Sequence, residues 1–178
     1  MDNINSKTFE RLQEYKVDFA YSKNLFYSAV NRLEKEEKNY LKWKKYMDIA
    51  ILIFSLLSFS SAISSNMPNY ILGVSAFLAF GLSAYQFINS KDFSQIKDYK
   101  NTADNYLILY KKCKNIIVKA EDEVLDTNEL SVKIDELLNI QSELIKTSPK
   151  TEDTDYLEAK RQIANGNSGY TEQEIQNT

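Results

Sequence analysis

The sequence predicts an all-α membrane protein, in which a two-transmembrane helical hairpin extends into a cytoplasmic antiparallel helical bundle. Three observations predict this fold class. The 178 residues include only four glycines and two prolines, too few for the many turns of a β-rich protein. A block of 42 residues, 49–90, has no charged side chain, although 26% of the chain is charged. On both sides of this block, apolar side chains recur at helical spacings of three and four residues.

The charge-free block contains two apolar stretches of transmembrane length. They cover residues 47–63 and 70–88, and at 1.5 Å per residue they reach about 25 and 28 Å, close to the roughly 30 Å of bilayer hydrocarbon. Residues 64–69 are a short linker, which we expect to be an outside loop. The alternative is a buried helical hairpin of a soluble protein, but such a hairpin normally has a polar face.

Aromatic residues mark the expected membrane boundaries, because Trp and Tyr concentrate at the interface between lipid and water. An acidic residue at the inner boundary, Asp48, either reaches water and nearby lysines or acts as a gate charge. The predicted interfacial residues are Trp43, Tyr46, Asp48, Tyr70 and Tyr85.

Basic residues indicate the orientation of the hairpin. Arg32 and five lysines precede the first span, and Lys91, Lys97 and Lys100 follow the second, whereas the linker has no basic residue. Cytoplasmic flanks of membrane spans carry an excess of Lys and Arg. We therefore expect both termini in the cytoplasm.

Helical patterns continue on the cytoplasmic side. We expect helices over residues 6–46, 91–125 and 127–147, the last one opened by a capping box of Asp126 and Glu129. No glycine or proline lies between residues 82 and 148, so the composition gives the second span no reason to stop at the membrane surface. The hairpin brings the aromatic seams of the helices back side by side, and we expect them to pack antiparallel.

The chain divides into a two-transmembrane helical domain, residues 1–148, and a polar, partly disordered tail, residues 149–178. Within the tail, Tyr156, Leu157 and Ile163 have the spacing of a short helix of one or two turns. Cys113 lies on the seam of the preceding domain, where we expect a buried core residue without reactivity.

Small side chains lie along one face of each span, and two interpretations stay open. Such stripes let transmembrane helices pack closely, and serine hydroxyls can also line a wet path. One hairpin cannot enclose a channel, so a pore requires a homo-oligomer in the lipid bilayer. The candidate pore-lining or helix-packing residues are Ser55, Ser58, Ala62, Ser65, Gly73, Ser75, Ala79, Gly81 and Ser83.

The composition argues against an enzyme and against nucleic acid as a partner. The chain has no histidine and one cysteine, and it has no glycine-rich loop, so we expect no catalytic residue, no metal and no cofactor. Its net charge is −3 and its lysines are interleaved with acidic residues, as on solvated helix faces.

The layout resembles a known family. A charged N-terminal helix is followed by the spans IAILIFSLLSFSSAI and YILGVSAFLAFGLSAYQFI and by a Tyr- and Lys-rich helix that begins KDFSQIKDYKNTADNYLILYKKC. Over residues 6–147 this is similar to the SLATT family, the small two-transmembrane effectors associated with SMODS nucleotidyltransferases and SLOG nucleotide-sensing domains.

The resemblance implies a pore-forming or membrane-disrupting effector of a bacterial antiviral, nucleotide-signalling conflict system. Such a protein would act as an oligomer in the bacterial inner (plasma) membrane and would kill or arrest the cell. A separate protein, a nucleotide-signal synthase or sensor, would trigger it. The alternative function is a membrane-anchored coiled-coil scaffold that recruits a cytoplasmic partner.

Overall fold

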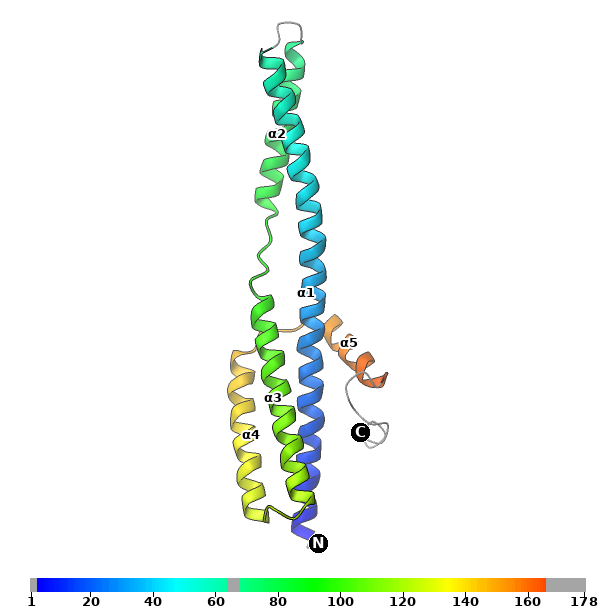
Figure 1. Cartoon of the computed structure of the whole chain (residues 1–178), viewed down its shortest axis with the longest axis vertical. Coiled ribbons are helices and arrows are strands. Elements are labelled where there is room, and N and C mark those ends of the chain that lie inside the picture. Colours follow the sequence, from blue (N-terminus) through cyan, green and yellow to red (C-terminus); the bar gives the residue numbers. More distant parts are fainter. Residues whose placement is uncertain (1–2, 64–67, 166–178) are drawn as a thin grey trace. The chain divides into compact units, whose positions relative to one another are not determined.

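The computed structural model describes residues 3–63 and 68–165, and within these ranges it has five helices and no strand. The predicted all-α class is confirmed for this part of the chain. Two compact units can be distinguished: a core unit, residues 1–33 and 94–178, and a span unit, residues 34–93. The helices are α1 (Asn3–Ile63), α2 (Asn69–Ile88), α3 (Ile96–Glu121), α4 (Thr127–Thr147) and α5 (Asp153–Ala164), as Figure 1 shows.

In the core unit, residues of α1, α3 and α4 share one hydrophobic core. Phe19 of α1, Leu109 of α3 and Leu130 of α4 are at most 1% exposed. Burying an apolar side chain of this size stabilises the fold by about 1.5–3 kcal/mol. The buried members of the core are Leu12, Phe19, Phe26, Ala29, Val30, Leu33, Tyr99, Ala103, Tyr106, Leu109, Cys113, Ile116, Ile117, Leu130, Ile134, Leu137 and Leu144.

Contacts between α1 and α3 fix their relative direction inside the core unit. The ring of Phe26 stacks on Tyr106 at a centroid distance of 5.6 Å and meets Tyr99 at 6.4 Å. Further along α3, the Cys113 thiol donates to the carbonyl of Leu12 over 3.4 Å. Later residues of α3 thus face earlier residues of α1, so the two segments run in opposite directions. Their contacts use the seam positions that the sequence pattern identifies.

Both ends of the turn between α3 and α4 are capped. The predicted capping box is confirmed: Asp126 accepts from the Glu129 backbone N–H over 2.8 Å, and the Glu129 carboxylate accepts from the Asp126 N–H over 3.2 Å. At the end of α3, the N–H groups of Val124 and Glu123 donate back to the carbonyls of Lys119 and Ala120. This is a Schellman motif, and it holds Glu123 at a φ of 57°, where glycine is usual.

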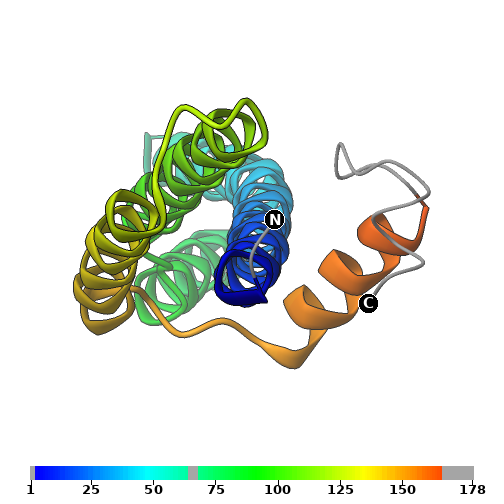
Figure 2. The ribbon, with the colours of Figure 1, turned by 90° about the horizontal axis from the view of Figure 1, so that it is seen from below.

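A fifth helix lies within the segment that we expected to be largely mobile. Figure 2 shows α5 beside α1, on the side of α1 away from α4. Its 12 residues exceed the expected one or two turns. Ala159 is fully buried, and the ring of Tyr156 meets Tyr21 of α1 edge-on at 5.5 Å. Residues 166–178 of the predicted tail lie outside the described residues.

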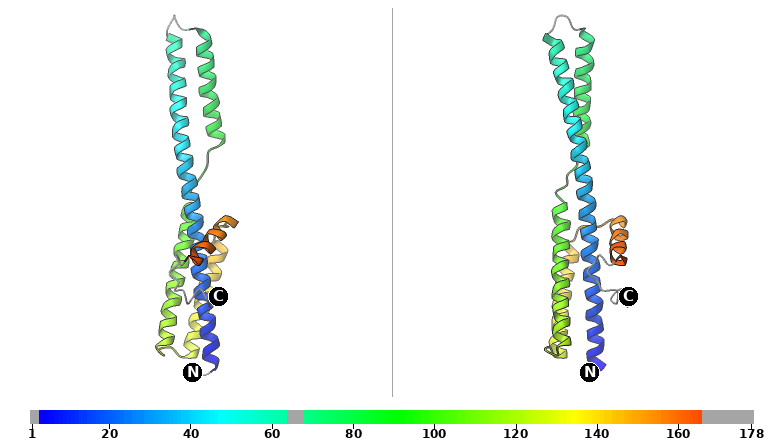
Figure 3. Two further views of the ribbon diagram at one scale, coloured as in Figure 1. Left: turned by 90° about the vertical axis from the view of Figure 1, so that its right-hand side faces the viewer. Right: turned by 45° about the vertical axis from the view of Figure 1, so that its right-hand side comes forward.

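The span unit is a helical hairpin of α1 and α2, drawn from two sides in Figure 3. The second helix does not continue past the span: α2 ends at Ile88, and the next helix starts at Ile96 rather than at residue 91. The end is made by Asn89, whose backbone N–H and side-chain amide both donate to the Tyr85 carbonyl, over 3.0 and 2.8 Å. Asparagine side chains compete in this way with helical hydrogen bonding, so a helix can stop without glycine or proline.

Candidate functional site

The side chains of the two spans point mostly outward. In the most apolar windows of α1 and α2 only 6% of residues are buried within the chain, and large side chains such as Phe77, Phe80 and Phe87 are more than 70% exposed. An apolar surface of this extent is unfavourable in water and matches the hydrocarbon of a bilayer. Both helices are long and apolar enough to cross a membrane.

Serine side chains make one polar contact between the two spans. The hydroxyls of Ser58 on α1 and Ser75 on α2 lie 2.7 Å apart, and Ser75 is buried. Each hydroxyl also reaches a carbonyl of its own helix, Phe54 for Ser58 at 2.9 Å and Ile71 for Ser75 at 2.6 Å. The neighbouring Ser61 is buried as well, although the sequence analysis did not select it.

The other small residues of the predicted stripe do not meet across the hairpin. Ser55 and Ala62 are exposed, and Ser83 is exposed and donates to the Ala79 carbonyl of its own helix over 2.8 Å. Gly73 and Gly81 are also exposed, and a Cβ built on either would find no atom within 4 Å. Ala79 is half-buried, and Ser65 lies outside the described residues. The structure therefore brings Ser58 and Ser75 together. It leaves the other small residues exposed on the surface of the hairpin, namely Ser55, Ala62, Gly73, Gly81 and Ser83.

The predicted interfacial aromatic residues, Trp43, Tyr46, Tyr70 and Tyr85, are all more than half exposed. Asp48 is also exposed, and its carboxylate accepts from the Gln86 side-chain amide of α2 over 2.8 Å. This partner is Gln86 rather than one of the lysines expected from the sequence. A signal was present, because a glutamine is unusual one turn before the end of an apolar span.

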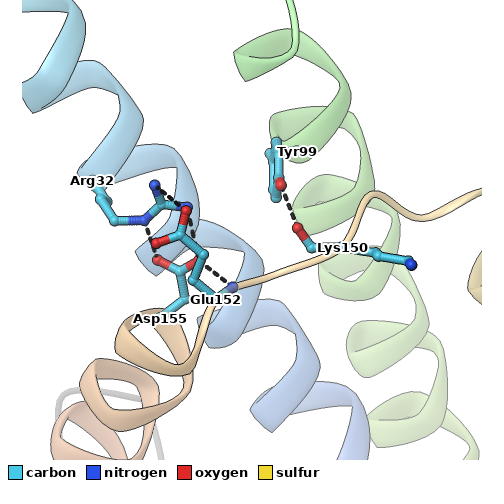
Figure 4. A network of polar contacts seen from close by, with 5 residues as sticks. All are labelled: Arg32, Tyr99, Lys150, Glu152 and Asp155. Carbon is cyan, nitrogen blue, oxygen red and sulfur yellow. Dashed lines mark hydrogen bonds and ion pairs between the residues drawn. The ribbon is translucent and has the colours of Figure 1, made fainter.

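A second polar contact, in the core unit, joins α1 to α5 (Figure 4). The guanidinium of Arg32 donates to both carboxylate oxygens of Asp155, over 2.9 and 3.1 Å, and forms an ion pair with Glu152 at 3.0 Å. Asp155 is 1% exposed, so its charge depends on this partner. The Tyr99 hydroxyl of α3 donates to the Lys150 carbonyl just before α5. Sequence reasoning missed this network, because 123 residues separate Arg32 from Asp155.

Burial favours the protonated form of two titratable side chains of the core unit, Cys113 and Tyr27. Burial raises the pKa of the Cys113 thiol to about 12, with Lys16 acting in the opposite direction. Burial, assisted by a 2.5 Å hydrogen bond that its hydroxyl donates to Asp104, raises the pKa of Tyr27 to about 12. A thiol that stays protonated is a poor nucleophile and a poor metal ligand. In the described ranges, no three His, Cys, Asp or Glu side chains come together as metal ligands.

Comparison with known protein families places most of the chain in one family. The family described as "SMODS and SLOG-associating 2TM effector domain family 4" matches residues 16–174. This match confirms the resemblance stated above, and it extends beyond residue 147 to include α5. No match was found among curated proteins or among solved structures.

Proposed function

Because this chain belongs to the SMODS and SLOG-associating 2TM effector domain family 4, we propose that it is a membrane effector that assembles into pores. Family membership and the two candidate spans make it a membrane-associated effector of conflict systems. Pore formation, as the means by which it would damage a cell, is the step that we add.

The observation that carries the pore proposal is the set of small residues left open after the hairpin has formed. Ser55 and Ala62 on α1, and Gly73 and Gly81 on α2, have no role in the contact between the spans. Small residues let transmembrane helices approach closely and hydrogen-bond. These faces are therefore suited to contacts between copies, and several copies around an axis are what a pore requires.

Our proposed topology places both termini and the core unit in the cytoplasm of a bacterial inner membrane. The basic residues beside the spans support this orientation, since the linker between the spans has none. In this arrangement α1, α3 and α4 form a cytoplasmic antiparallel bundle. A separate nucleotide-signal synthase or sensor protein would act on that bundle, a role suggested by the family description.

Leucine substitutions at the open glycines test the proposal. Gly73→Leu with Gly81→Leu should leave insertion intact, because leucine is favourable in hydrocarbon, but should prevent close approach of copies. We expect crosslinked oligomers and dye-reported depolarisation of expressing cells to fall together. Val74→Leu, an exposed position on the same helix, is the matched control and should change neither.

Serine substitutions separate a wet lumen from simple packing. Ser55 is exposed, whereas Ser58 contacts Ser75 inside the hairpin. If Ser55 lines the water path, Ser55→Leu should lower depolarisation while the oligomer yield stays constant. Full depolarisation by Ser55→Leu would remove this residue from the conduction path. No depolarisation by the parent chain, expressed with and without its neighbouring genes, would contradict the pore itself.

A second candidate function is a membrane-anchored scaffold that recruits a cytoplasmic partner. The attachment of α5 favours it, because Tyr156 and Leu157 are more than half exposed on that helix. Tyrosine is a typical anchor of a protein interface, and the neighbouring leucine adds apolar surface. If a variant neither forms oligomers nor depolarises the membrane of expressing cells but still binds a cytoplasmic partner, the scaffold is favoured over the pore.

A further inference from the structure

The span unit contains a groove that none of the roles above uses. It has a volume of about 420 Å³ and lies along α1 residues 36–47 and beside the end of α2. Aromatic, basic and amide side chains line it together, among them Tyr40, Trp43, Lys44, Tyr85, Asn89 and Lys91. This mixture differs from the uniformly apolar surface of the spans.

The early end of α2 creates the groove. After Ile88 the chain leaves the helix through the Asn89 cap, and at Phe93 it returns to α1, where the ring packs on Tyr40 at 5.7 Å. Between these two points no helical turn of α2 covers α1. The face of α1 around Trp43 consequently remains open, and the side chain of Trp43 is 63% exposed.

The groove lies at the boundary between apolar and charged sequence. Its lining includes Met47, two positions before the charge-free block 49–90, and Gln86 near the end of that block, and Lys44 and Lys91 lie on either side of it in the sequence. Trp and Tyr rings prefer the level of lipid headgroups and glycerol. A ligand that fills this groove therefore has one end in water and the other against hydrocarbon.

The charges near the groove favour an anion. Lys44 and Lys91 line it, Lys42 and Lys45 lie close by on α1, and Asp92 follows Lys91 directly, so basic residues outnumber acidic ones there. The one acidic lining residue, Glu36, is eight positions before Lys44, which is about 12 Å along the helix and away from the spans. Asp48 lies nearer to the spans, and its carboxylate accepts from Gln86.

We propose that this groove binds the headgroup of an anionic phospholipid. Lys44 and Lys91 would hold the phosphate, the amides of Asn39 and Asn89 would meet the polar headgroup, and the acyl chains would follow the exposed surface of the spans. The proposal rests on insertion of the spans into a bilayer and does not need a pore. Its failure can therefore be told apart from failure of the pore, which is read by depolarisation.

Trp43 makes the test direct, since it is the only tryptophan of the chain and it lines the groove. The full chain is placed in phosphatidylcholine nanodiscs that contain a small, equal mole fraction of brominated phosphatidylglycerol or brominated phosphatidylcholine. Bromine quenches tryptophan fluorescence on contact. From two lysines we expect a preference on the order of tenfold for the anionic lipid.

Two double variants distinguish a built site from general surface charge. Lys44→Gln with Lys91→Gln should lower the preference to about onefold, whereas Lys42→Gln with Lys45→Gln, which removes the same charge at nearly the same level, should retain most of it. Lys44→Arg with Lys91→Arg keeps the charge and should keep the preference. A retained preference in this arginine double variant would also show that positions 44 and 91 tolerate substitution.

Several results would overturn the proposal. Equal quenching of the parent chain by the two brominated lipids would show that the groove does not select an anion. Equal losses in the two glutamine variants would assign the effect to diffuse surface charge. Relief of quenching by millimolar inorganic phosphate or glycerol phosphate would identify a soluble phosphate as the occupant, in place of a lipid.

Discussion

Removing the charge of Asp155 should detach α5 from α1 without unfolding the core that α1, α3 and α4 share. Asp155→Asn keeps the shape of the side chain but takes away the bidentate ion pair with Arg32. Breaking a buried ion pair costs about 3–5 kcal/mol. Because Arg32 is 20% exposed and retains Glu152 as a partner at 3.0 Å, we lower the expected cost to about 2–3 kcal/mol.

This cost should appear as local opening. The buried residues of α5 are Asp155 and Ala159, and an alanine contributes little apolar burial, so the ion pair and the ring contact of Tyr156 with Tyr21 are the main attachments of the helix. A change of 2–3 kcal/mol corresponds to roughly a 30- to 150-fold rise in the opening equilibrium. The hydrophobic core shared by α1, α3 and α4 contains no residue of α5, so its stability should change much less.

Hydrogen exchange followed by mass spectrometry measures this directly. Amides of α5 should lose protection in Asp155→Asn, while amides of α3 keep theirs. Glu158→Gln is the matched control, because Glu158 pairs with Arg161 inside α5 on the exposed surface, and such pairs contribute little. Unchanged protection of α5 in Asp155→Asn, or equal loss in the control, would refute the reasoning.

Five further predictions concern four single positions. Phe26→Ala should lower the free energy of unfolding in detergent by about 3–5 kcal/mol, because it removes the ring that packs on two tyrosines of α3. Cys113 should resist thiol reagents between pH 7 and 9 in the folded chain, since its pKa is raised to about 12, and should react once the chain is unfolded. Because the unfolded thiol loses its proton first, stability should fall as pH rises from about 9 towards 12. Glu123→Gly should raise the denaturation midpoint by the equivalent of about 0.5–1 kcal/mol, because glycine adopts a positive φ without strain. Asn66→Cys in a Cys113→Ser background should be labelled by an impermeant reagent on intact cells, if both termini are cytoplasmic.

Each of these predictions has an outcome that contradicts it. A loss below 1 kcal/mol for Phe26→Ala would mean that the stacked rings are not packed as described. Rapid labelling of Cys113 in the folded chain would contradict its burial. A destabilising Glu123→Gly would argue that the glutamate side chain stabilises the turn. Labelling of position 66 only after the cells are opened would show that the linker is cytoplasmic and that the predicted orientation is wrong.

Local patterns in the sequence were sufficient to predict much of the fold. Aromatic seams on the helices were predicted from spacing alone, and aromatic residues such as Phe19 of α1 and Tyr106 of α3 are buried. The capping box of Asp126 and Glu129 was predicted from two residues three apart, because its hydrogen bonds join neighbours in the sequence. Patterns of this kind indicate interactions between residues of one helix and show which face of that helix is apolar.

Interactions between distant residues were not predictable in the same way. No periodicity links Arg32 to Asp155, so the docking of α5 could not be seen in a segment that reads as polar. The predicted end of the second span at residue 88 agrees with α2, but the non-helical segment 89–95 was missed, because the Asn89 side chain folds back on its own helix, a choice that composition does not decide. Ser58 and Ser75 were both selected, but their pairing depends on the rotation of each span about its axis.

The hydroxyl groups of Ser58 and Ser75 have two protons between them, fewer than the three short contacts that these hydroxyls make. Two hydroxyls, each with one proton, face each other and two backbone carbonyls, those of Phe54 and Ile71, so only two of the three short contacts can be hydrogen bonds at any moment. If the helices part, each proton turns to the carbonyl of its own helix, and no donor is stranded in hydrocarbon. The usual penalty for breaking a polar contact inside a membrane is thus largely absent here. Ser58 and Ser75 align the hairpin, yet they let it separate and re-form at low cost.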